Sequence, residues 1–280
     1  MDVHPGCVVT ELSAEHPPFN PLPREIAPGV FWLARCLCIP FMGKISHGYN
    51  SSFLVVGETG SAFIETGITI DCHEVIRQFE ELRLTHDIPD PTHIFVTHSE
   101  MGHSGGLGLL LERFPSAHAY GDVSDHHLVF PRVADRLHFA DPGDRFDLGG
   151  REIVVVEGVF RDLVHTRWFF DVKQRVLFPG DGFAFSHYHD DGACGRLAEE
   201  TPDLAVVENT ARFADVAFHW TRFVDIDPYV DRLQTLIFDE LDVAMIASTH
   251  GLPIGDPVAT MPAVMDGLRA MRTYGDVGAD

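Results

Sequence analysis

Histidine and acidic residues gather at the ends of apolar runs in this sequence. His98, Glu100 and His103 lie within "THSEMGHSGG", which directly follows the apolar run "HIFV". Asp181 ends the run in "VLFPGD", and His250 ends "VAMIASTH". Imidazole nitrogens and carboxylate oxygens are the donors that transition metals use in proteins. The pattern therefore indicates metal chemistry, and the candidate ligands are His98, Glu100, His103, His165, Asp181 and His250.

Predicted strands would bring these residues to one place. In layered α/β folds, ligands gather in the loops that leave one end of the strands. The predicted strands cover 29–39, a hairpin over 51–67, 93–98, 117–122, 152–158, a hairpin over 167–181, and 243–250. The predicted helices cover 71–84, 105–114, 212–223, 229–241 and 261–275. This order predicts an α/β fold in which helices cover a sandwich of sheets.

Length and composition favour one large domain. The chain has 280 residues with 45% hydrophobic content, which is enough for a single core. Residues 1–22 are rich in proline and show no periodicity, so we expect an irregular N-terminal arm there. We expect residues 23–280 to form the single domain.

The charge balance excludes some classes of partner. Acidic residues outnumber basic residues 42 to 20, which gives a formal net charge of −22. Such a surface repels phosphate backbones and anionic membranes, so we expect neither nucleic acid nor membrane as a partner. The first residues lack the features of a secretory signal, and no apolar stretch approaches the roughly 18 residues of a membrane span. A cytoplasmic location is predicted.

The cysteines show no obvious metal or disulfide pattern. Their number, five, is odd, and no CxxC pair occurs. Neither a disulfide framework nor a zinc knuckle is therefore predicted. We interpret them as reduced thiols that mostly fill space in the core: Cys7, Cys36, Cys38, Cys72 and Cys194.

The candidate ligand set resembles that of the metallo-β-lactamase superfamily, and within it that of the β-lactamase-like domain of flavodiiron proteins. The resemblance runs from about Pro28 to Pro257. The superfamily usually carries His-x-His-x-Asp-His and zinc, whereas flavodiiron proteins carry His-x-Glu-x-Asp-His and two irons. This chain has "HSEMGH", then "LVHTRWFFD", "LFPGDGF" and "ASTHG" in the same order, with "YNSSFLV" and "RFADVAFHW" as further matches. The resemblance implies an αβ/βα sandwich of two mixed sheets flanked by helices.

The resemblance also implies which residues hold which metal. His98, Glu100 and His165 would hold the first ion. His103 and His250 would hold the second, and Asp181 would bridge the two. Two iron ions are implied, with zinc as the alternative.

Two departures from the family change the expected chemistry. Gly102 stands where flavodiiron proteins have an aspartate at the second metal, which leaves coordination positions free for oxygen chemistry. The chain ends about 30 residues after His250, with no flavodoxin-like domain and hence no FMN site. We expect electrons to come from a separate reductase or from the substrate.

Gly102 leaves other site arrangements open. A single iron could be held by His98, Glu100, His165 and Asp181. A residue from elsewhere could instead fill the corner, and His187 and His189 in "FSHYHDD" are the nearest candidates. Side chains that could reach the ligands and hydrogen-bond to them are His47, His187, Tyr188 and His189.

These features predict a non-haem diiron oxidoreductase that uses dioxygen. It would oxidise a small organic substrate, or reduce dioxygen or nitric oxide with an external donor. A zinc-dependent hydrolase of an ester, lactone, thioester or phosphodiester is one alternative, and a diiron oxygen-sensing binding protein is another. A homo-oligomer is compatible with the sequence. A group of aromatic residues is predicted to be core, and any part of it that lined the mouth would imply an apolar substrate: Phe183, Phe185, Phe218, Trp220 and Phe223.

Overall fold

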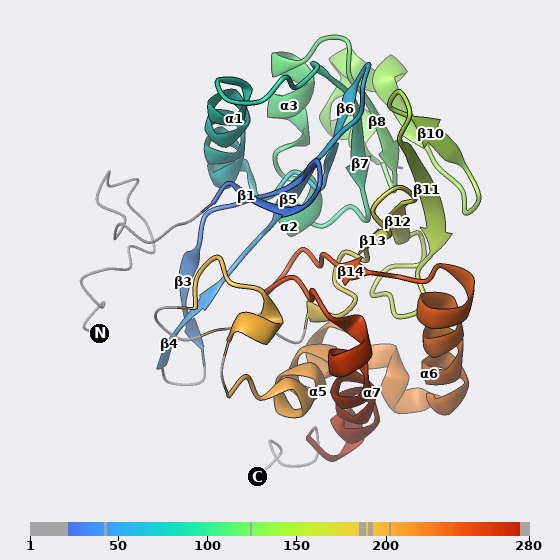
Figure 1. Ribbon diagram of the computed structural model, residues 1–280. Helices are drawn as coiled ribbons and strands as arrows, with labels where there is room; N and C mark the ends of the chain where they lie inside the picture. The colour runs from blue at the N-terminus through green and yellow to red at the C-terminus, as the bar shows by residue number, and fades with distance from the viewer. Residues whose placement is uncertain are drawn as a thin grey trace.

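Two β-sheets face each other, and helices cover the outer face of each (Figure 1). The computed structural model describes residues 22–41, 44–123, 125–184, 189, 193–201 and 203–274. Apart from Leu22, the predicted N-terminal arm lies outside the described residues. The predicted α/β sandwich of two mixed sheets flanked by helices is confirmed.

The first sheet has seven strands in the order β1-β2-β5-β6-β7-β8-β9. The strands from β1 to β6 pair antiparallel, and β6 to β9 pair parallel. The parallel strands lead toward the candidate ligands: Glu65 directly follows β6, and the candidate ligand His98 lies two residues after β7. The bounds are β1 (Arg24–Ala27), β2 (Val30–Leu33), β5 (Ser52–Val56), β6 (Ser61–Ile64), β7 (Pro91–Val96), β8 (His118–Gly121) and β9 (Leu137–Phe139).

The second sheet has five strands in the order β10-β11-β12-β13-β14. All neighbours are antiparallel except β13 and β14, which run parallel. The bounds are β10 (Arg145–Asp147), β11 (Glu152–Glu157), β12 (Arg167–Asp171), β13 (Val176–Phe178) and β14 (Met245–Ile246). A separate hairpin pairs β3 (Leu37–Phe41) with β4 (Lys44–Gly48).

The helices divide between the two outer faces (Figure 1). Helices α1 (Thr69–Arg83) and α3 (Leu107–Arg113) contribute to an apolar cluster with the first sheet. Helices α5 (Val206–Ala217), α6 (Asp227–Gln234) and α7 (Pro257–Tyr274) form another with the second sheet. The short helical segments are α2 (Met101–Ser104), α4 (His126–Val129), η1 (Pro131–Arg136), η3 (Ala198–Glu200), η4 (His219–Phe223) and η5 (Thr235–Glu240).

A third apolar cluster fills the space between the two sheets. Trp32 and Phe53 from the first sheet and Phe169 from the second are fully buried within it. Burying such aromatic side chains contributes about 1.5–3 kcal/mol each relative to leaving them exposed. This cluster fixes how the sheets face each other, and therefore how the loops at their shared edge meet.

A buried ion pair also joins the two sheets. Arg151 precedes β11, and its Nε atom donates to Asp171 at the end of β12 over 3.0 Å. Its Nη1 atom donates to the backbone carbonyls of Pro28, Gly29 and Val56 beside the first sheet at 3.0–3.1 Å. All three guanidinium nitrogens are thus hydrogen-bonded, and loss of the side chain would leave Asp171 buried without its counter-ion.

Several predicted elements differ from the observed ones at their ends. The predicted strand over 29–39 is two strands, because Arg35 binds Asp71 of α1 at 2.8 Å and the chain leaves the first sheet there. The predicted helix over 212–223 begins earlier, at Val206, and ends at Ala217. The last predicted strand, 243–250, is regular only over Met245–Ile246, and the remainder is the loop that carries His250.

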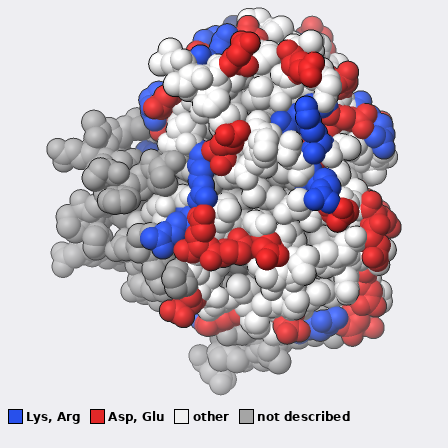
Figure 2. All heavy atoms as spheres, viewed as in Figure 1, with Lys and Arg blue, Asp and Glu red and all other residues white. Residues whose placement is uncertain are grey.

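Charged side chains are mixed on the surface. Figure 2 shows acidic side chains lying next to basic ones on the viewed face. In the part of the chain that the structure describes, no helix combines the length and the apolar character needed to cross a membrane.

Candidate metal centre

Four predicted ligands meet at the edge shared by the two sheets. His98 and His103 are fully buried, and their ring centroids lie 3.7 Å apart. Asp181 Oδ1 lies 3.0 Å from His103 Nε2 and 3.2 Å from His250 Nε2. One carboxylate oxygen is therefore close to two imidazole nitrogens, and a donor atom of Asp181 also lies within 4.8 Å of donor atoms of His98, Glu100 and Asp162.

The donor atoms of this centre fit a metal. Among the described residues, four buried atoms of the centre make no hydrogen bond of normal geometry: His98 Nε2, His103 Nε2, Asp162 Oδ2 and Asp181 Oδ1. Buried polar atoms without hydrogen bonds are rare and need an explanation, of which an ion is one. Several such atoms in one cluster favour a bound cation there.

Asp162, not His165, lies beside the predicted ligands. Asp162 Oδ2 is 3.4 Å from His98 Nε2, and Thr166 donates to the other carboxylate oxygen at 3.1 Å. His165 is exposed, and its ring contacts Phe139 edge-on with centroids 5.6 Å apart. His165 lies in a turn that is closed by a hydrogen bond from the Thr166 N–H to the Leu163 carbonyl at 3.2 Å, and this turn leaves Thr166 buried and His165 exposed. The structure therefore does not bring His165 to the centre.

Glu100 completes an acidic side of the centre. A carboxylate oxygen of Glu100 lies within 4.8 Å of donor atoms of His98, Asp162 and Asp181. Burial raises the pKa of Glu100, and the nearby charges of Asp162 and Asp181 raise it further. Like charges at this distance oppose ionisation, and a bound cation would relieve that repulsion.

Glu65 supports the centre from behind and was not predicted. It is 1% exposed, and its Oε1 atom accepts hydrogen bonds from His103 Nδ1 at 3.1 Å and from Thr249 at 3.3 Å. Thr97 donates to the same oxygen. Its position after the strand in "FIETG" matches the positions of the candidate ligands after their strands, and that was the available signal.

The hydrogen bonds to the ligands leave the other ring nitrogens facing the centre. His103 Nδ1 donates to Glu65, so Nε2 faces Asp181. His250 Nδ1 donates to the carbonyl of Tyr49 at 2.8 Å, which leaves Nε2 toward Asp181. Outer hydrogen bonds of this kind fix the orientation of metal-binding histidines and raise their basicity.

In the metal-free centre, the electrostatic environment favours a protonated His103 imidazole and an ionised Asp181 carboxylate. Burial alone would lower the pKa of His103, but the carboxylates of Glu65 and Asp181 together outweigh it and raise the pKa to about 10. Burial alone would raise the pKa of Asp181, but His103 and His250 hold it well below its ordinary value. Burial and the charge of His103 lower the pKa of His98.

The space beside Gly102 is narrow. A Cβ atom at Gly102 would lie 3.2 Å from His250 Cε1 and 3.2 Å from Asn50 Oδ1. The carboxamide oxygen of Asn50 is thus the nearest polar atom to the corner where flavodiiron proteins have an aspartate. His189 lies in a different cluster with Cys36, His47 and Cys194, while His187 and Tyr188 lie outside the described residues.

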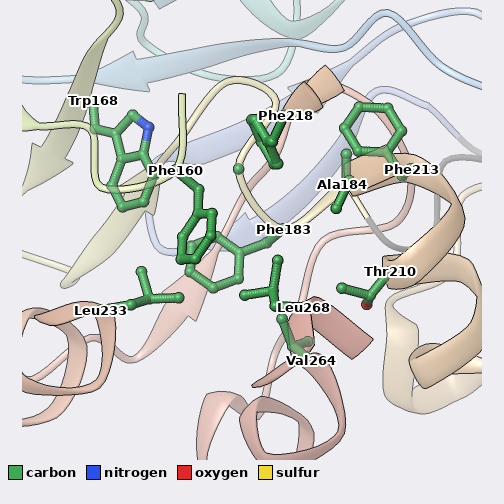
Figure 3. Close-up of a pocket in the computed structure, with 12 residues that line it drawn as sticks. Phe160, Trp168, Phe183, Ala184, Thr210, Phe213, Phe218, Leu233, Val264 and Leu268 are labelled. Carbon is green, nitrogen blue, oxygen red and sulfur yellow. The ribbon is translucent and has the colours of Figure 1, made fainter. Parts of the chain in front are cut away.

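Two cavities border the centre. The first, of about 20 Å³, is apolar and is lined by Phe183, Phe213 and Phe218 among others (Figure 3). Phe183 lies two residues after Asp181, and the Phe213 ring centroid lies 6.2 Å from that of His250. The second, of about 410 Å³, is lined by Asp162 together with Arg161 and Arg232.

The aromatic residues that the sequence predicted as core lie in different environments. Phe183 and Phe218 are buried and line the small cavity, whereas Phe223 is 77% exposed. Trp220 lines the larger cavity, and Phe185 lies outside the described residues.

Comparisons with known sequences identify several similar proteins, of which the flavorubredoxin and the oxidase are longer than this chain. No family model matches it. It is 26% identical over 220 residues to the anaerobic nitric oxide reductase flavorubredoxin of Vibrio vulnificus, covering 75% of this chain and 41% of that protein. It is 24% identical over 258 residues to the coenzyme F420H2 oxidase of Methanothermobacter marburgensis, covering 86% and 60%. A shorter match, 36% identical over 115 residues and 39% of this chain, is to the hydroxyacylglutathione hydrolase of a Cyanothece species, covering 40% of that protein.

Solved structures share the fold. The rubredoxin oxygen:oxidoreductase of Desulfovibrio gigas superposes with a TM-score of 0.70 at 14% identity, covering 90% of this chain and 61% of that one. A metallo-β-lactamase from Pontibacter korlensis superposes with a TM-score of 0.54 at 14% identity, covering 88% and 97%. The chain spans about two fifths to three fifths of the length of the flavorubredoxin and the oxidase. The predicted resemblance is confirmed: the chain is similar in sequence to flavodiiron proteins and shares the metallo-β-lactamase fold.

Proposed function

We propose that the centre binds two iron ions and that the protein is an oxidoreductase that reduces dioxygen or nitric oxide. The observation that carries this proposal is the cluster of buried donor atoms without hydrogen bonds from His98, His103, Asp162 and Asp181. The similarity to a nitric oxide reductase and to an F420H2 oxidase supports the reaction class.

The ligand geometry divides into two halves around Asp181. His98, Glu100 and Asp162 would hold the first ion, and His103 and His250 would hold the second. Asp181 would be shared by the two ions. In this assignment Asp162 takes the part that the sequence predicted for His165.

The donor types favour iron over zinc in the first half. One imidazole and three carboxylates, from Glu100, Asp162 and Asp181, form a hard donor set. Structural and catalytic zinc sites in proteins are mostly built from histidine and cysteine, whereas carboxylate-rich sets suit harder ions. When bound, ferrous iron would supply electrons and open coordination positions for a small oxidant.

Residues around the candidate ligands fix the orientation of the ligand side chains, and two cavities beside the centre determine which molecules can reach it. Glu65 and the Tyr49 carbonyl fix the rings of His103 and His250, and Thr166 fixes Asp162. The apolar cavity beside Phe213 has room for about one water-sized molecule, which suits a diatomic gas better than an organic substrate. The larger cavity beside Asp162 is big enough for part of an organic electron donor.

Anaerobic metal loading tests the proposal. Metal-free full-length protein is mixed with ferrous iron, desalted, analysed for iron, and then exposed to dioxygen or to nitric oxide. We expect the iron held by this centre to be oxidised, with a new visible absorption, and nitric oxide to yield nitrous oxide. Retained iron that reacts with neither gas, or iron binding that survives His98→Ala, would overturn the proposal.

A second function has one observation in its favour. The match to a hydroxyacylglutathione hydrolase is the most identical of those described above, although it covers little more than a third of the chain. A zinc-loaded centre that hydrolyses a thioester panel, and an iron-loaded centre that does not react with gases, would favour hydrolysis.

A further inference from the structure

Two cysteines and two histidines form a second cluster outside the candidate metal centre. Cys36 follows β2, His47 lies in β4, and Cys194 lies in a turn before η3. His189 completes the group from the segment that follows Asp181. Cys36, His47 and His189 are 8%, 8% and 3% exposed, and Cys194 is partly buried.

The distances within this cluster are those of a tetrahedral metal site. Zinc–sulfur bonds of ~2.3 Å and zinc–nitrogen bonds of ~2.0 Å at tetrahedral angles place ligand atoms roughly 3.3–3.8 Å apart. His47 Nδ1 lies 3.3 Å from Cys36 Sγ and 3.4 Å from Cys194 Sγ. The two Sγ atoms lie 3.4 Å apart, and His189 Nε2 lies 3.7 Å from Cys36 Sγ.

We propose that Cys36, His47, His189 and Cys194 bind one zinc ion in a structural site. Two thiolates and two neutral imidazoles around Zn²⁺ give a complex without net charge, which is the form best suited to a buried position. All four positions are filled by protein atoms, so the site has no place for a substrate. Cys₂His₂ sets are typical of structural zinc.

The site would tie together segments that are distant in sequence. The backbones of His47 and His189 exchange two hydrogen bonds of 2.9 Å, so the ion would reinforce an existing bridge between two segments. The Cys194 turn is held by Gly195, whose N–H donates to the Tyr49 hydroxyl at 2.7 Å and whose carbonyl accepts from Arg24 at 2.7 Å.

Tyr49 connects this site to the candidate metal centre. Its ring stacks on His189 with centroids 5.2 Å apart and an interplanar angle of 17°. Its carbonyl accepts the Nδ1–H of His250. The zinc site would therefore position the backbone that orients a ligand of the other centre, without contributing a ligand to it.

A disulfide is the competing use of the two thiols. The two Sγ atoms are close enough to form a bond of about 2.05 Å after a small movement. A disulfide, however, would not explain why His47 Nδ1 lies within 3.4 Å of both sulfurs. The test below separates the two uses.

Metal analysis of matched variants tests the proposal. Full-length wild type, Cys36→Ser, Cys194→Ser and Cys72→Ser are purified with reductant and analysed for zinc and iron. Cys72 serves as the control. It is a buried thiol that donates to the Gly106 carbonyl and does not belong to the cluster. We expect one zinc per chain in wild type and Cys72→Ser, and its loss in the other two. Equal zinc in all four proteins would overturn the proposal.

A second measurement needs no variant. Cobalt(II) added to the metal-free wild type should give intense thiolate-to-cobalt absorption and the visible bands of a tetrahedral ion. Zinc should protect Cys36 and Cys194, but not Cys72, from alkylation under mild denaturant. A Cys36–Cys194 disulfide found by peptide mapping, with no cobalt bands after its reduction, would contradict the zinc site. Iron is counted in the same samples, so failure here is distinguishable from failure of the iron centre.

Discussion

The imidazole of His103 lies between two carboxylates, and Glu65 approaches its Nδ1 atom at 3.1 Å from the side opposite the centre. Glu65 has a positive φ of 64°, a conformation that costs a non-glycine residue about 1–3 kcal/mol. The surrounding hydrogen bonds from Ser52, Thr97 and Thr249 hold it there. A strained backbone that several hydrogen bonds hold in place beside His103 supports a role for Glu65 in fixing the orientation of the His103 ring.

Replacing Glu65 by glutamine should weaken metal binding without removing a ligand. The amide keeps the shape but loses the charge that stabilises the His103 ring, and loss of such outer partners typically lowers metal affinity by about 10–100-fold. Anaerobic titration with ferrous iron measures the change. Glu58→Gln, on the exposed turn between β5 and β6, is the control and should bind like wild type. Unchanged affinity in Glu65→Gln would contradict this role.

Asp162→Asn and His165→Ala should give opposite results. Asp162 faces His98 at 3.4 Å, so its loss should reduce iron retained after desalting and lower affinity at the first ion at least tenfold. His165 is exposed and contacts Phe139, so its loss should leave iron content unchanged. Iron analysis of the two variants side by side is the measurement. The reverse result would restore the ligand assignment that the sequence alone suggested.

Metal loading at neutral pH should release a proton from His103. Its pKa of about 10 in the metal-free protein means that the ring is protonated at pH 7 and must lose a proton to bind metal. That protonation stabilises the metal-free fold at neutral pH and below, and the contribution is lost as pH rises toward 10. Apparent affinity should therefore rise by up to about tenfold per pH unit between pH 7 and 9. Calorimetry in buffers of different ionisation enthalpy measures the release, and a buffer-independent heat would argue against it.

Arg151→Met should destabilise the fold strongly. The change leaves Asp171 buried without its counter-ion, and breaking a buried pair costs about 3–5 kcal/mol. Arg145→Met, in the exposed pair with Glu152, should cost no more than about 1 kcal/mol. Urea unfolding gives both values. Combining Arg151→Met with Asp171→Leu should recover part of the loss, and similar costs for the two single variants would be inconsistent with a connecting role between the sheets.

The fold and most of the candidate centre were predictable from the sequence because ligands that end strands leave a readable pattern. His98, His103, Asp181 and His250 each follow an apolar run or lie just beyond one, and the structure brings them together. Asp162 was not predictable, because the loop between β11 and β12 offers Asp162 and His165 three residues apart, and the turn that places Asp162 inward and His165 outward leaves no pattern in the sequence. The family motif favoured the histidine.

The second cluster was not predictable for a different reason. Cys36 and Cys194 are separated by 158 residues, and spacing rules detect only ligands that are close in sequence. Their approach depends on the hairpin of β3 and β4 leaving the first sheet, and the sequence suggested one continuous strand there. The cysteines were interpreted as space-filling thiols, and His47 and His189 as candidates for the other site.

X-ray absorption at the iron and zinc edges of the loaded protein tests the central claim most directly. The account predicts an iron edge with only nitrogen and oxygen neighbours plus an iron–iron distance, and a zinc edge with two sulfur and two nitrogen neighbours. Zinc with only nitrogen and oxygen neighbours in protein that was offered both metals would contradict the iron assignment of the His98, Asp181 and His250 centre.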